Sequence, residues 1–264
     1  MFSSFHGCTC LDLSFFFPAD FPLSYSMLLI GMSFITSGMT AAVGLGGGVT
    51  LIAIMASVMP AAALVPVHGV VQLGSNAGRA LVHFRHIDWG ILAWYCLGAL
   101  LGAALGGSIA VNVPAPYLRL GIAAFVLWVV WGRKPKVDAR HKFAMGIGGF
   151  IATLLSMFFG ASGPVGAAFL STFNMSRHGF VANQAVTTLF MHIFKIAAFG
   201  LLGFAFAPWL GLILLMTVSG FLGTLVGSQL LGKMNEATFK KGFKIVMTLL
   251  ALNLLWQALS DILA

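Results

Sequence analysis

The sequence predicts an all-α, polytopic membrane protein built from two repeated halves. Hydrophobic residues make up 59% of the 264 residues, charged residues only 8%, and the mean hydropathy is +1.00. Apolar runs of about 20 residues, long enough to cross a hydrocarbon core of about 30 Å, recur along the chain. A glycine-rich motif and the polar positions after it also occur twice at one spacing. Hydropathy therefore predicts the helices, and the repeat predicts how they are grouped.

Six apolar runs predict membrane-spanning helices, at 67–83, 89–111, 117–132, 180–203, 208–231 and 243–260. Two further apolar stretches, 22–59 and 143–175, are too long for one crossing and too short for two comfortable ones. Each stretch contains a glycine-rich break, so we expect a helical hairpin that enters the membrane and returns. Each half then consists of one broken hairpin followed by three transmembrane helices.

The repeat has an offset of 116 residues, which carries Gly44-Leu45-Gly46-Gly47-Gly48 onto Gly160-Ala161-Ser162-Gly163-Pro164. The same offset relates four pairs of polar residues: His68 to Gln184, Gln72 to Thr188, Asn76 to His192 and Arg79 to Lys195. Further along, a ladder of small residues recurs, as Gly98, Gly102 and Gly106 and then as Ser219, Gly223 and Gly227. We therefore divide the chain into an N-terminal tail (1–21), a first half (22–132), a basic linker (133–142) and a second half (143–264).

The net charge of +8 comes from basic residues in short loops, a pattern that sets membrane orientation and does not indicate nucleic acid binding. The loop 83–88 is basic, whereas its counterpart 204–207 has no charge; 112–116 has none, whereas 232–241 carries lysines. Equivalent loops are thus expected on opposite sides of the membrane, with the linker 133–142 in the cytoplasm. This arrangement is an inverted repeat, which many secondary transporters share. Eight full spans in two parallel halves is the alternative.

The glycines at the two breaks predict an anion-binding site. Glycine tolerates unusual backbone angles and lets a ligand approach the chain. Helices that restart near Val49 and Val165 present free N–H groups and a partial positive charge, which bind anions. We assign substrate contacts here to Gly46, Gly47, Gly48, Ser162 and Gly163. The alternative is that these glycines only permit close helix packing, as we expect for the ladder of Gly98, Gly102 and Gly106.

Two polar stripes at helical spacing flank the breaks, one formed by His68, Gln72, Ser75, Asn76, Arg79 and His83, and the other by Gln184, Thr188, His192 and Lys195. Lys195 lies deep in an apolar stretch, where a cation costs roughly 2.5 to 3.5 kcal/mol, so a functional role is expected. We assign substrate binding to Gln72, Asn76, Arg79, Thr188, His192 and Lys195, and proton coupling to His192 and His68. The alternatives are that these residues only cross-link helices through hydrogen bonds, and that Arg79 extends to the interface.

Acidic residues are confined to tails, loops and span ends: Asp12, Asp20, Asp88, Asp138, Glu236 and Asp261. A cation site or a carboxylate proton relay within the membrane is therefore not expected. Cys8, Cys10 and Cys96 do not form a metal-ligand pattern, so we expect neither a metal nor a cofactor.

The duplicated break, the prolines at 60 and 66 and the loop Arg85-His86-Ile87-Asp88-Trp89 resemble the sulfite exporter TauE/SafE family over about residues 23–260. The resemblance implies a multi-pass permease of the inner membrane, usually an exporter, for small sulfur-containing anions such as sulfite or organosulfonates. It leaves the exact substrate, the coupling ion and the oligomeric state, monomer or homodimer, open.

Two other functions fit parts of the sequence. An anion channel, or a permease for other organic anions, would use the same positive helix ends and polar stripes. A rhomboid-like intramembrane serine protease would use Ser162 as nucleophile and His192 as base. The repeat places Ser162 opposite Gly46, which favours a backbone role, and an activated serine also needs an oxyanion hole. We therefore expect a transporter and not an enzyme.

Overall fold

The computed structural model describes residues 16–43, 46–82, 84–133, 141–230 and 236–263. Within these ranges all regular secondary structure is helical, with ten α-helices and two short 3₁₀ turns, so the predicted all-α class is confirmed. Several predicted features lie outside the described residues, namely the cysteine pair Cys8 and Cys10, residues 44–45, His83, Lys233 and positions 134–140 of the linker.

Each half begins with two helices separated by a glycine-containing break and continues with three more. The first half contains α1 (Leu23–Val43), α2 (Gly47–Val58), α3 (Ala61–Val82), the turn η2 (Phe84–His86), α4 (Trp89–Ala110) and α5 (Ala115–Trp131). The second half contains α6 (Ala144–Phe159), α7 (Gly163–Leu170), α8 (Arg177–Leu201), the turn η3 (Ala207–Trp209), α9 (Leu210–Leu230) and α10 (Glu236–Leu263).

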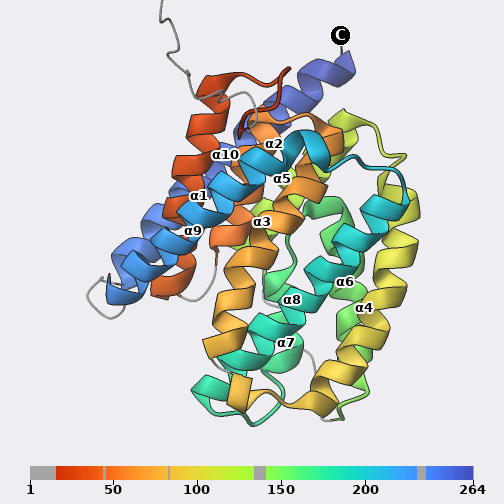
Figure 1. The fold of residues 1–264 in the computed structure, drawn as a ribbon, viewed down its shortest axis with the longest axis vertical. Coiled ribbons are helices and arrows are strands. Elements are labelled where there is room, and N and C mark those ends of the chain that lie inside the picture. The colour runs from red at the N-terminus through yellow and green to blue at the C-terminus, as the bar shows by residue number, and fades with distance from the viewer. Residues whose placement is uncertain (1–15, 44–45, 83, 134–140, 231–235, 264) are drawn as a thin grey trace, which may run out of the picture.

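The helix starts reproduce the repeat. The starts of α2 and α7 are 116 residues apart, at Gly47 and Gly163, and the starts of α3 and α8 have the same separation, at Ala61 and Arg177. Contacts between the halves are reciprocal, because α1 packs on α9 while α6 packs on α4. The remaining large contacts pair equivalent helices, α3 with α8 and α5 with α10. Both halves therefore contribute to one core (Figure 1).

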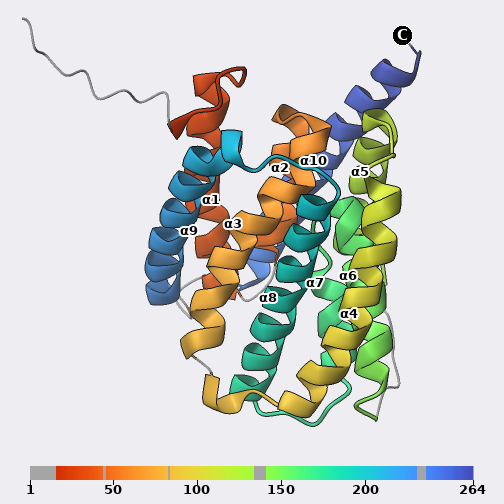
Figure 2. The same cartoon turned by 45° about the vertical axis from the view of Figure 1, so that its right-hand side comes forward.

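The helix directions can be followed in Figures 1 and 2. From the end of the molecule that carries the C-terminus, α1 descends and α2 returns to that end, while α6 rises from the opposite end and α7 returns there. The helices α3 and α8, which lie side by side, run in opposite directions. The turn η2 and the starts of α6 and α8 meet at the end opposite the C-terminus, which we call the lower end.

Five described helices are long and apolar enough to cross a membrane: Leu23–Ala41, Trp89–Ala110, His178–Leu201, Ala207–Gln229 and Lys241–Leu263. The shorter apolar helices are Gly47–Val58, Ala115–Trp131 and Ala144–Phe159. At 22 residues, α3 is as long as the spanning helices but carries one of the polar stripes. The chain is a multi-pass membrane protein.

The small-residue ladders pack helices closely, as predicted. A Cβ at Gly102 of α4 would lie 2.5 Å from the Phe150 carbonyl oxygen of α6. At the equivalent contact between α9 and α1, a Cβ at Gly223 or Gly227 would overlap backbone atoms of Phe34 or Gly38. Without side chains at these positions, the backbones approach directly and gain dispersion contacts in the absence of a hydrophobic driving force.

Candidate functional site

The two glycine-rich motifs break the hairpins at equivalent places. Gly46 precedes α2 with a φ of 104°, and Gly160 ends α6 with a φ of 72°. Both values lie in the left-handed region that favours glycine. No side chain caps the start of α2 or α7, so the first N–H groups of these helices have no partner within their own helix. Both helices start two residues before the predicted positions.

A cavity of about 70 Å³ lies between the two breaks, which is room for a few waters or one small polyatomic anion. Five elements line it: α1, α3, α8 and the starts of α2 and α7. The lining residues are Thr40, Gly46, Gly48, Val49, His68, Gln72, Asn76, Arg79, Ala161, Ser162, Gly163, Pro164, Gln184, Thr188, Met191 and His192. The site is deeply buried, since the side chains of His68, Asn76, Ser162 and His192 are at most 2% exposed.

Ten of the twelve residues to which the sequence analysis assigns substrate binding or proton coupling line this cavity. The two that do not are Gly47 and Lys195. Gly47 packs against α1, where a Cβ would overlap the Thr36 carbonyl oxygen. The arrangement brings the predicted residues together, and their contact with an anion stays a prediction.

His68 and Gln184, which the repeat relates, make equivalent contacts with the breaks. The Nε2 of His68 lies 3.0 Å from the Gly48 carbonyl oxygen, at the start of α2. The Nε2 of Gln184 donates to the Gly163 carbonyl oxygen at 3.3 Å, at the start of α7. Each polar helix thus holds the first turn of the broken helix in its own half.

Three buried side-chain atoms at the cavity have no hydrogen-bond partner among the described residues: His68 Nδ1, His192 Nδ1 and Gln184 Oε1. The two imidazoles come from different halves, and their ring centroids are 6.2 Å apart in an edge-to-face arrangement. Buried polar atoms are normally paired in proteins. Unpaired atoms around a cavity are therefore available to a bound molecule.

Arg79 is the one lysine or arginine among the described residues that line the cavity. Its Nη2 donates to the Asn76 side-chain oxygen at 2.7 Å, and the Asn76 amide donates to the Gln72 carbonyl oxygen at 2.7 Å. The guanidinium is thereby directed along the polar stripe of α3 and toward the cavity, and not to the interface as the alternative interpretation had it.

Lys195 is fully buried beside the cavity. Its Nζ donates to the Gly160 carbonyl oxygen at 2.8 Å and to the Ser156 hydroxyl at 3.0 Å. The ammonium therefore sits at the C-terminal end of α6, where the helix dipole is negative. In this conformation it holds the break after α6, and its predicted contact with the anion stays a prediction.

Two lining residues, Thr40 and Met191, are absent from the predicted site. Ser162 donates its hydroxyl proton to the Met191 sulfur at 3.1 Å, so the hydroxyl is not directed at a base. No local sequence signal marks a threonine or a methionine within an apolar helix as a cavity residue. Their place in the site depends on how α1 and α8 pack.

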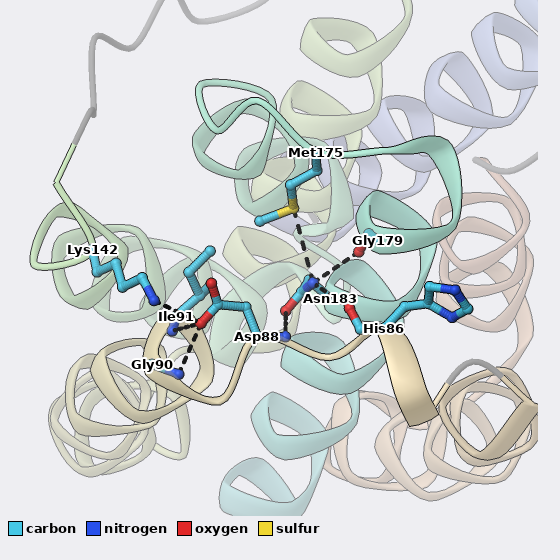
Figure 3. Close-up of polar contacts among 8 residues, drawn as sticks. All are labelled: His86, Asp88, Gly90, Ile91, Lys142, Met175, Gly179 and Asn183. Carbon is cyan, nitrogen blue, oxygen red and sulfur yellow. Dashed lines mark hydrogen bonds and ion pairs between the residues drawn. The ribbon is translucent and has the colours of Figure 1, made fainter.

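A polar network joins the halves at the lower end (Figure 3). The Asn183 side-chain oxygen of α8 accepts from the Asp88 N–H at 3.0 Å, and its amide donates to the His86 carbonyl oxygen at 3.2 Å. The Asp88 carboxylate caps α4 and pairs with Lys142 at 2.9 Å. Burial raises the pKa of Asp88, but the hydrogen bonds from Lys142 and from the backbone of α4 outweigh burial and hold this pKa below its ordinary value.

The chain matches the family model described as "Sulfite exporter TauE/SafE" over residues 29–254. No curated protein and no solved structure matches it. The matched range contains both breaks, both polar stripes and every residue that lines the cavity.

Proposed function

Because the chain belongs to the sulfite exporter TauE/SafE family of membrane transporters for sulfur-containing anions, we propose that it is a secondary transporter that binds one small anion between the starts of α2 and α7. Transporters of this family are not enzymes, which removes the intramembrane protease alternative. Sulfite is the substrate we propose first, with organosulfonates of similar size second.

The observation that carries this proposal is the composition of the cavity. The positive ends of two helices face one space, and helix N-termini attract anions through their N–H groups and their dipole. Arg79 adds a full positive charge, and no aspartate or glutamate is among the lining residues. Asn76, Thr188 and Ser162 supply polar groups that replace lost water hydrogen bonds, without which each buried polar group costs about 1 to 3 kcal/mol.

We propose an inverted repeat and transport by alternating access. The opposite directions of α3 and α8 and the reciprocal packing of α1 on α9 and α6 on α4 support this arrangement. The network around Asn183 joins the halves at the lower end, so opening toward that end requires it to break. We place the lower end in the cytoplasm and the chain in the inner membrane, because the basic loop at 83–88 and Lys142 belong to this end.

The test is uptake of radiolabelled sulfite into proteoliposomes that are preloaded with unlabelled sulfite. Saturable counterflow, absent from empty liposomes, is the expected result. Arg79→Met should abolish it, while Arg133→Met, at an exposed arginine distant from the cavity in sequence, should not. An ohmic current without counterflow would favour the channel alternative. Absence of flux with sulfite, sulfoacetate and sulfate would overturn the proposed substrate class.

A further inference from the structure

We infer that the cavity selects its oxyanion in the singly protonated form, so that sulfite is bound and carried as hydrogensulfite. This inference rests on the proposed function and deepens it, because it specifies the charge and the protonation state of the substrate. It follows from two hydrogen-bond acceptors in the cavity and from the number of cations that face it.

The first acceptor is the Gln184 side-chain oxygen. A carbonyl oxygen can only accept, so the Gly163 carbonyl at 3.3 Å requires the nitrogen of the Gln184 amide to point at it. The amide orientation is thereby fixed, and Oε1 is left buried and unpartnered among the described residues. Only a donor on a bound molecule can pair with this atom.

The second acceptor is His68 Nδ1. The Gly48 carbonyl at 3.0 Å places the proton of a neutral imidazole on Nε2, which leaves a lone pair on Nδ1. This atom is also buried without a partner among the described residues. A fully deprotonated oxyanion has only acceptors and meets both atoms with lone pairs, whereas hydrogensulfite donates one O–H.

Charge matching favours the same form. Arg79 is the one full cation among the described lining residues, and the Lys195 ammonium is engaged with Gly160 and Ser156. The other titratable groups at the cavity are His68 on α3 and His192 on α8. The lining residues of α1, α2 and α7 have no titratable side chain. One cation balances a monoanion, and a dianion would leave one negative charge uncompensated in a buried site.

The test is calorimetric titration of the purified protein with sulfite at pH values on both sides of the hydrogensulfite pKa. The expected result is that the Kd, expressed per total sulfite, rises tenfold for each pH unit above that pKa, while the Kd per hydrogensulfite stays constant. Methanesulfonate, a monoanion without an O–H, should bind more weakly and without this pH dependence.

Gln184→Met keeps the length of the side chain and removes the acceptor. It should reduce the preference for hydrogensulfite over methanesulfonate, whereas Gln229→Met, the same change at an exposed position of α9, should not. His192→Gln tests the competing explanation, because a pH dependence that disappears in this variant places the proton on the histidine and overturns the inference. A sulfite Kd that is independent of pH overturns it as well and leaves the proposed function intact. If none of sulfite, sulfate and methanesulfonate binds at any pH, the proposed function itself fails.

Discussion

Replacement of Lys195 by methionine removes the buried ammonium and keeps an unbranched side chain. Two hydrogen bonds are lost, to Gly160 and Ser156. Hydrogen bonds of a charged group contribute about 1.5 to 3 kcal/mol each, or roughly 3 to 6 kcal/mol together. Relief from holding a cation at membrane depth returns about 2.5 to 3.5 kcal/mol. The net destabilisation is therefore between about 0 and 3.5 kcal/mol, so we expect Lys195→Met to fold.

Transport should nevertheless be lost in this variant. Gly160 directly precedes Ala161, Ser162 and Gly163, which line the cavity, and Lys195 holds the Gly160 carbonyl. The assay combines thermal unfolding in detergent with sulfite counterflow in proteoliposomes. Lys241→Met, at an exposed position of α10, is the matched control and should retain both properties. Full counterflow in folded Lys195→Met would refute the argument that this lysine supports the site.

Three further predictions address the cation, the break and the lower-end network. Arg79→Met should raise the sulfite Kd about 10- to 150-fold, which corresponds to one lost charged interaction of about 1.5 to 3 kcal/mol, and Arg79→Lys should recover part of it in the same titration. Gly160→Ala should lower the unfolding free energy by more than the about 1 to 2 kcal/mol of the left-handed backbone, because its Cβ meets an α2 side chain at 2.6 Å; Gly203→Ala, with a φ of 93° and open space around it, should show the backbone cost alone. Since its folded-state pKa is depressed, Asp88 should stabilise the protein above the ordinary carboxyl pKa of about 3.9 and lose this contribution as the pH falls through the folded pKa, so the melting temperatures of the wild type and Asp88→Ala should converge in acid.

Sequence reasoning reached the breaks and the polar stripes because both are local. A glycine run within an apolar stretch indicates a backbone that leaves the helix, and spacings of three and four residues put Gln72, Asn76 and Arg79 on one face. The partners of Lys195 are 35 and 39 residues away and depend on how α6 packs against α8, which no local pattern encodes. For the same reason Thr40 was missed.

The repeat also explains why two related cations have different environments. The offset of 116 that relates Lys195 to Arg79 relates Ser156 to Thr40. Lys195 is bonded to Ser156, whereas the Thr40 hydroxyl donates to the Thr36 carbonyl oxygen at 3.0 Å and Arg79 donates to an asparagine. If the two halves exchange conformations during alternating access, as inverted repeats do, Arg79 should bond Thr40 in the opposite-facing state and Lys195 should be released into the cavity.

That exchange predicts opposite effects of two conservative changes. Ser156→Ala removes a partner of Lys195 in the present conformation, and Thr40→Val removes the expected partner of Arg79 in the other. In a background without the native cysteines, Thr188→Cys places a thiol in the cavity, where an impermeant reagent reports which side is open. Ser156→Ala should increase labelling from the side that is closed in the present conformation, and Thr40→Val should decrease it. Shifts in the same direction for both variants would show that the two cations do not exchange roles.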